Sequence, residues 1–145
     1  LKIKDYVDNT FCLTYGDGLS NINIKKLIQQ HKKLKKSATM SVVLPSGRFG
    51  AVEISKNKKI NKFIEKPKGD NQWVNGGFFV LEKNIFKYLK NDQTVWEKEP
   101  LQNLAKDNQL FSFKHNGFWH PMDTLRDKIY LDSLWESKKA HWKVW

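Results

Sequence analysis

A chain of 145 residues with a mass of 17.1 kDa is long enough to form one domain with a hydrophobic core. Hydrophobic residues make up 39% of it, and its six Trp and nine Phe exclude an intrinsically disordered chain. The formal charge of +11 raises the possibility of nucleic-acid binding, but the 26 basic residues include only two arginines, so a solvated lysine-rich surface is the favoured interpretation.

The N-terminal half of the sequence predicts strands around one helix. An apolar run from residue 11 to residue 15 predicts a buried strand that ends abruptly in the turn Gly16-Asp17-Gly18. Apolar residues then recur at three- and four-residue steps from Ile24 to Leu34, which predicts an amphipathic helix capped by Asn23. Further strands are expected at residues 38–44, 49–54 and 60–66.

The C-terminal half continues the alternation. Its expected elements are a strand at 74–81, helices at 83–90 and 100–106, a strand at 110–115 and an aromatic loop at 117–123. Thr124 then caps a last helix, with Asp127 in the capping-box position. This order of elements predicts an α/β sheet, and it places Asp17 at the carboxyl end of a strand, where ligands gather in such sheets.

The beginning of the sequence and its cysteine content predict the compartment. Residues 1–7 contain no initiator Met, and lysine and aspartate interrupt the apolar runs, so neither a signal peptide nor a membrane span is expected. The single cysteine, Cys12, lies in an apolar run and is interpreted as a buried apolar residue, with a catalytic nucleophile as the alternative. Without a disulfide framework, a cytoplasmic location is favoured. We expect one domain over residues 1–145, beginning within a longer protein.

Several short polar motifs are weak signals when each is taken alone. They could be a tight turn, a charged strand end, a β-bulge and a helix cap. Together and in order, they resemble the glucose-1-phosphate cytidylyltransferases of the sugar-nucleotide pyrophosphorylase family. The resemblance spans almost the whole chain and rests on Thr14-Tyr15-Gly16-Asp17-Gly18, Gly47-Arg48-Phe49-Gly50-Ala51, Glu65-Lys66-Pro67-Lys68, Asn75-Gly76-Gly77-Phe78-Phe79, Thr94-Val95-Trp96-Glu97 and Phe118-Trp119-His120-Pro121-Met122-Asp123-Thr124.

The resemblance implies both a fold and a reaction. The implied fold is a mixed, mostly parallel sheet of the Rossmann-like nucleotide-diphospho-sugar transferase type, lacking its N-terminal half. The implied reaction transfers a cytidylyl group from CTP to α-D-glucose 1-phosphate, giving CDP-glucose and pyrophosphate for deoxysugar and lipopolysaccharide O-antigen biosynthesis. The family's glycine-rich nucleotide-binding segment is not found, so the isolated chain is expected to be inactive. The alternative is a non-catalytic sugar-phosphate-binding or oligomer-assembly module of the same fold.

The resemblance also assigns charged residues to the reaction. Asp17 and Asp123 match the two aspartates that hold Mg²⁺, and Lys66 matches the lysine that meets the sugar phosphate. Hard oxygen ligands suit Mg²⁺, and phosphates and water complete its octahedron. A sugar phosphate is already nucleophilic near neutral pH, so charge neutralisation and positioning are the main requirements. Arg48 and Arg126 are candidates for phosphate contacts or for structural ion pairs.

A second group of residues matches the sugar pocket of the family. Glu65 matches a residue that accepts hydrogen bonds from sugar hydroxyls, and Gly50, Asn75 and Gly76 match backbone and amide positions that line the pocket. Trp119 could pack on the sugar or base, although an indole in an apolar loop is more often part of the core.

The sequence also leads to an expectation about assembly with other chains. The strand at residues 11–15 is normally central in this family, so its edge would be unpaired here, and we expect another chain to cover it. The family resemblance implies a homo-oligomer. The aromatic stretch 135–145 is a candidate contact, and it could equally pack on its own domain. Neither a nucleic acid nor a membrane is expected as a partner.

Overall fold

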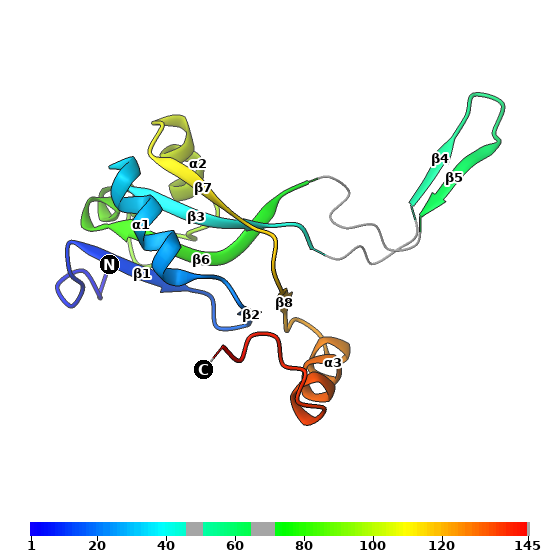
Figure 1. The fold of residues 1–145 in the computed structure, drawn as a ribbon. Coiled ribbons are helices and arrows are strands. Elements are labelled where there is room, and N and C mark those ends of the chain that lie inside the picture. The colour runs from blue at the N-terminus through cyan, green and yellow to red at the C-terminus, as the bar shows by residue number, and fades with distance from the viewer. Residues whose placement is uncertain (46–50, 65–71, 145) are drawn as a thin grey trace.

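The computed structural model describes residues 1–45, 51–64 and 72–144 (Figure 1). In chain order its elements are β1 (Thr10–Thr14), β2 (Gly18–Ser20), α1 (Ile24–Leu34), β3 (Ala38–Val43), β4 (Ala51–Ile54), β5 (Ile60–Ile64), β6 (Val74–Glu82), the 3-10 helix η2 (Lys83–Tyr88), α2 (Glu99–Lys106), β7 (Leu110–His115), β8 (Trp119–Pro121) and α3 (Leu125–Glu136). The strands form one four-stranded sheet, β1-β6-β3-β7, and two separate pairs, β2-β8 and β4-β5.

The four-stranded sheet confirms the expected mixed α/β architecture. β6 lies between β1 and β3 and is antiparallel to both, whereas β3 and β7 are parallel. The expected excess of parallel pairs is therefore not seen among these four strands. The reason is that the chain leaves β3, runs through the β4-β5 hairpin and returns alongside β3 in the opposite direction as β6.

The helix α1 confirms its prediction from the sequence. Asn23 caps it, because its Oδ1 accepts a hydrogen bond of 2.9 Å from the Lys26 backbone N–H. The buried face carries Leu27 and His31, both 1% exposed. The helix ends at Lys35, which takes the left-handed conformation at φ 51°. Basic residues fill the last turn, where positive charge complements the helix dipole.

The core lies on both faces of β6, which explains why that strand is a nearly continuous apolar run. One face contributes Phe79 and Leu81 to a cluster with Ala38, Ile85, Phe86 and Leu104. The other face contributes Val80, which packs with Ile22 and Leu27 beneath α1. Phe79, Val80 and Leu81 are each at most 1% exposed. β6 is therefore the strand around which the domain is organised.

Three expectations about local structure are wrong. Cys12 is exposed, because β1 turns Phe11 and Leu13 toward the core and the residues between them outward. The helix expected at 83–90 is the shorter 3-10 helix η2, whose N-terminus has no side-chain cap. The aromatic loop expected at 117–123 contains the strand β8.

The sheet also bears on the expectation about assembly. In the described parts of the chain, β1 pairs with β6 on one side and with no strand on the other, so it is an edge strand. Whether another chain covers that edge stays a prediction.

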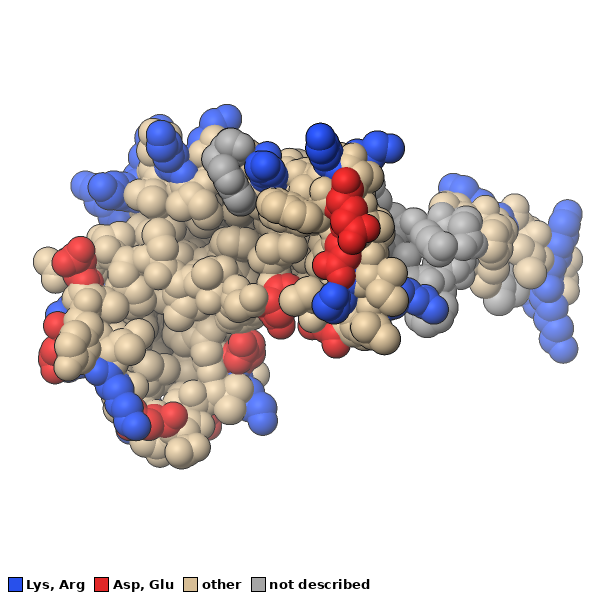
Figure 2. Space-filling view, turned by 90° about the horizontal axis from the view of Figure 1, so that it is seen from below, with Lys and Arg blue, Asp and Glu red and all other residues tan. Residues whose placement is uncertain are grey.

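The β4-β5 hairpin stands away from the rest of the domain (Figure 1). It fits the strands expected at 49–54 and 60–66 over the residues that are described. On the face drawn in Figure 2, lysine and arginine side chains lie in separate places rather than in one continuous patch. Among the described residues, no helix combines the length and apolar character needed to cross a bilayer.

Candidate active site

The two aspartates predicted to hold a metal ion are brought together by β2 and β8. These short antiparallel strands pair Gly18 with Pro121. One residue beyond that pair, the Met122 backbone N–H donates to the Asp17 carbonyl at 2.8 Å. Asp17 and Asp123 therefore flank the same end of this ladder, although 105 positions separate them in the sequence (123 minus 17, less one). Both residues are exposed, so their carboxylates are open to ligands.

Asp123 is also fixed from its C-terminal side by the beginning of α3. Thr124 caps this helix in a capping box: its hydroxyl accepts from the Asp127 N–H, and the Asp127 carboxylate accepts from the Thr124 N–H at 2.9 Å. The Thr124 hydroxyl, with a smaller contribution from His120, lowers the pKa of Asp127. Asp123 thus lies between a strand end and a helix cap that both hold its backbone.

Asn75, Gly76 and Gly77 on β6 form a second part of the site. The Gly77 N–H donates to the Asn75 Oδ1 at 2.8 Å, and the Trp119 indole N–H donates to the Gly76 carbonyl at 2.8 Å. A Cβ added at Gly18 would come within 4.0 Å of the same Gly76 carbonyl. The strand β6 and the β2-β8 ladder therefore meet here, and the half-buried Trp119 connects them.

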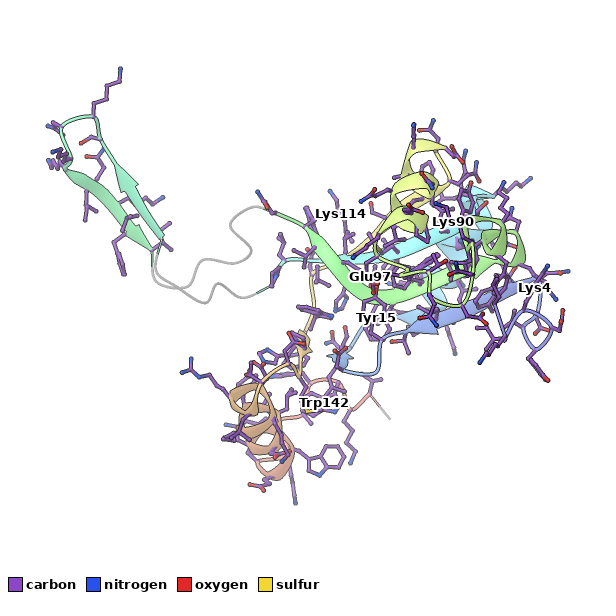
Figure 3. The ribbon with its side chains drawn as sticks, turned by 180° about the vertical axis from the view of Figure 1, so that it is seen from behind. Lys4, Tyr15, Lys90, Glu97, Lys114 and Trp142 are labelled. Atoms are coloured by element: carbon purple, nitrogen blue, oxygen red, sulfur yellow. The ribbon has the colours of Figure 1, made fainter. Side chains whose placement is uncertain are left out.

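Tyr15 lies between these two parts. It directly follows β1 and precedes Gly16 and Asp17, and its hydroxyl accepts a hydrogen bond of 3.0 Å from the Asn75 Nδ2. Glu97, in the segment before α2, has its carboxylate beside this hydroxyl (Figure 3). Burial, and then the Glu97 carboxylate, raise the pKa of Tyr15 far above its usual range, so the phenol stays protonated.

The donor set suits Mg²⁺. Asp17 and Asp123 supply only oxygen ligands, which Mg²⁺ prefers, and two carboxylates are the usual protein share where phosphates and water occupy the other positions. Among the described residues, no group of three or more His, Cys, Asp or Glu side chains could hold a metal ion, so a protein-only cage is not built there. The pair therefore fits an ion that is shared with a phosphorylated ligand.

The model of one protein family matches residues 1–136, which is most of the chain, and that family is described as nucleotidyl transferase. The chain belongs to this family. Among its curated relatives is a glucose-1-phosphate cytidylyltransferase of Salmonella typhi, 49% identical over 99% of the chain. A mannose-1-phosphate guanyltransferase of Hypocrea jecorina is 30% identical over 88% of the chain.

The chain spans only part of the length of these curated relatives: 56% of the Salmonella protein and 38% of the Hypocrea protein. Its fold is similar to that of a solved structure from Bacillus anthracis, with a TM-score of 0.65 at 20% sequence identity. That match covers 92% of this chain and 57% of the other. The likeness confirms the nucleotidyl transferase type of α/β fold.

The residues predicted for the nucleotidyl transferase site fall into three groups. Asp17, Asp123, Asn75 and Gly76 are described, and the structure brings them together through the contacts given above. Arg126 is exposed in the first turn of α3, three residues beyond Asp123. Arg48, Gly50, Glu65 and Lys66 lie outside the described residues, so their predicted roles stay predictions.

Sequence reasoning did not single out the side chains of Tyr15 and Glu97 in the nucleotidyl transferase site. Both lie inside motifs that carried the family resemblance, next to Asp17 in one case and before α2 in the other. The signal was therefore present, but 81 positions separate the two residues (97 minus 15, less one), and only the fold shows that they meet.

The close packing of Gly76 gives a testable prediction. A Cβ at this position would lie 2.6 Å from Ser41 Oγ and 3.0 Å from Val43 Cγ1. Ser41 cannot simply rotate away, because its Oγ accepts a hydrogen bond of 3.1 Å from the Phe78 N–H. We expect Gly76→Ala to lower the free energy of unfolding by about 1–3 kcal/mol, measured by urea denaturation.

Gly16→Ala is the matched control, since a Cβ there would meet nothing within 4 Å. It is expected to change the free energy of unfolding by less than about 0.5 kcal/mol. Equal stability of the two variants would show that β6 and β3 are not packed as closely as described.

Proposed function

We propose that the protein containing this chain transfers a cytidylyl group from CTP to α-D-glucose 1-phosphate, releasing pyrophosphate. The observation that carries the proposal is the meeting of Asp17 and Asp123 beside Asn75 and Gly76, in a family of nucleotidyl transferases. The choice of cytidylyl transfer to glucose 1-phosphate is supported by the 49% identity to the Salmonella typhi enzyme of that name, against 30% to the guanyltransferase.

The chemistry matches the residues. A phosphate oxygen of the sugar phosphate forms the new bond to the α-phosphorus of CTP, the bond from that phosphorus to the bridging oxygen breaks, and pyrophosphate leaves. No base is needed to activate the nucleophile, because the sugar phosphate is largely dianionic near neutral pH. The obstacle is the repulsion between two anions, so catalysis rests on positioning and charge neutralisation.

The chain's own residues divide these tasks in the proposal. Asp17 and Asp123 would hold Mg²⁺, which supplies positive charge to the phosphates when it is bound. Lys66 would meet the sugar phosphate, and Glu65 would accept hydrogen bonds from sugar hydroxyls. Asn75 would donate to the sugar, and Gly76 would line the pocket with its backbone, since a glycine lets a ligand approach the main chain closely.

Calorimetric titration of the chain tests this proposal. We expect glucose 1-phosphate to bind in the presence of Mg²⁺ and to bind much more weakly when the metal is chelated. Glucose without its phosphate serves as the control ligand and is expected not to bind measurably. Absence of glucose 1-phosphate binding at millimolar concentration with Mg²⁺ would contradict the assignment of a sugar-phosphate site to this chain.

The nucleotide part of the proposal needs a separate measurement. Purified full-length protein, incubated with Mg²⁺, glucose 1-phosphate and each nucleoside triphosphate in turn, is expected to release pyrophosphate fastest with CTP. Faster release with another triphosphate would keep the sugar site and overturn the cytidylyl assignment.

A further inference from the structure

The carboxamide of Asn75 has a fixed orientation. A backbone N–H can only donate, so the 2.8 Å contact from the Gly77 N–H identifies the carboxamide oxygen and not its nitrogen. The nitrogen then donates one of its two protons to the Tyr15 hydroxyl at 3.0 Å. Among contacts with the described residues, one Nδ2 proton of Asn75 is left over after these two.

The Tyr15 hydroxyl is held in a matching orientation. It accepts from Asn75, and its own single proton needs an acceptor. The Glu97 carboxylate lies beside it (Figure 3), and an ionised carboxylate can only accept. The donors therefore run in one direction, from Asn75 to Tyr15 to Glu97.

The backbone around this chain of donors is also held. The Tyr15 N–H donates to the Gly77 carbonyl at 2.9 Å. Gly77 has φ +78°, and a Cβ there would lie 3.0 Å from the Tyr15 ring, so this ring closes over the glycine. On its other side the Tyr15 ring packs against Phe79, with ring centroids 5.7 Å apart. Neither Tyr15 nor Asn75 can swing away without breaking several of these contacts.

We propose that Tyr15, directed by Glu97, is a positioning residue that fixes the carboxamide of Asn75 and leaves one of its Nδ2 protons for the substrate. The remaining N–H of Asn75 then selects a ligand oxygen that accepts a hydrogen bond, and we assign that oxygen to a hydroxyl of the sugar phosphate. This assignment rests on the proposed function, whereas the orientation of Asn75 does not. It also gives the motif that ends in Glu97 a role in the site, through a contact with Tyr15 rather than with the substrate.

The orientation is tested first without any ligand. Selective ¹⁵N labelling of asparagine shows the two Nδ2 protons of Asn75 as separate NMR signals, and their loss in Asn75→Asp assigns them. In the wild-type chain we expect the proton bonded to Tyr15 to lie downfield of its partner. Tyr15→Phe, which removes only the hydroxyl, is expected to move that signal to the position of a solvated asparagine. Glu97→Gln is expected to move it in the same direction by a smaller amount.

The matched control is Tyr88→Phe. Tyr88 also donates to a carboxylate, Asp107 Oδ2 at 2.9 Å, but it lies on η2 and makes no contact with Asn75. This variant is expected to leave both Asn75 signals unchanged. The orientation is overturned if Tyr15→Phe leaves the Asn75 signals at their wild-type positions, and the role of Glu97 is overturned if Glu97→Gln does so.

The assignment of the bound oxygen to a sugar hydroxyl is tested by adding glucose 1-phosphate or inorganic phosphate, each with Mg²⁺. Glucose 1-phosphate is expected to shift the second Asn75 proton, and phosphate alone is expected not to. Tyr15→Phe is expected to weaken glucose 1-phosphate binding by about threefold to tenfold, as suits one hydrogen bond, with Tyr88→Phe unchanged. A shift with phosphate alone, or unweakened binding by Tyr15→Phe, overturns the assignment to a sugar hydroxyl. Failure of the wild-type chain to bind glucose 1-phosphate would instead refute the proposed function and leave the ligand-free result standing.

Discussion

Asp123→Asn is expected to weaken divalent metal binding by at least about tenfold. Replacing a residue that only orients a metal ligand already lowers metal affinity by about 10–100-fold. Removing the charge of the ligand itself should lower it by at least as much. Asp17→Asn should have an effect of the same size, because the backbone hydrogen bond from Met122 to Asp17 places both aspartates at one end of the β2-β8 ladder. The measurement is a titration with Mn²⁺, a spectroscopic substitute for Mg²⁺, in the presence of glucose 1-phosphate, in which electron paramagnetic resonance counts the free ion.

Two comparisons make this result specific. Asp132→Asn is the control, because Asp132 pairs with Lys128 on α3 and is not part of the ladder. Its expected affinity for Mn²⁺ is that of the wild-type chain. The double variant of Asp17 and Asp123 should lose little more than either single variant, since both side chains serve one ion. Equal losses in the control, or additive losses in the double variant, would mean that the two aspartates do not share a metal ion.

Phe79→Ala is expected to lower the free energy of unfolding by about 3–5 kcal/mol. Phe79 is 1% exposed and lies on β6, which pairs with β1 on one side and β3 on the other. Its ring packs against Tyr15 and, edge to face, against Trp96 at 5.8 Å, so its removal leaves a cavity beneath the candidate site. Urea denaturation followed by tryptophan fluorescence measures the loss, which is a large fraction of the stability of an ordinary domain.

Phe63→Ala makes the same chemical change where little is buried. Phe63 lies on β5 of the hairpin and is 61% exposed. Its replacement is expected to change the free energy of unfolding by less than about 0.5 kcal/mol. A loss in Phe79→Ala no greater than that in Phe63→Ala would contradict the description of β6 as the centre of the core.

The sequence predicts those parts of the fold that leave a local pattern in it, such as a helical spacing of apolar residues or a helix cap. The three- and four-residue spacing of α1, its cap at Asn23 and the capping box at Thr124 are local signals, and all three are confirmed. Asp17 and Asp123 could be named as a pair only through the resemblance to a family, because nothing local connects two residues so far apart in the sequence.

The features that the sequence missed depend on tertiary pairing. β2 and β8 have three residues each, too few to show an alternation, and they are strands only because they pair with each other. Cys12 was placed wrongly because apolar residues lie on both sides of it, which hides the alternation of β1. The meeting of Tyr15, Asn75 and Glu97 likewise brings together three segments with no shared pattern.

The position of β6 between β1 and β3 sets an order for folding during synthesis. Both neighbours are made earlier by the ribosome, yet neither pairs with the other in the finished sheet. A nascent chain that has not yet emerged through residue 82 therefore carries β1 and β3 without the strand that joins them, and with their apolar faces exposed. The joining of β1 to β3 in one sheet must therefore wait for the release of β6 from the exit tunnel.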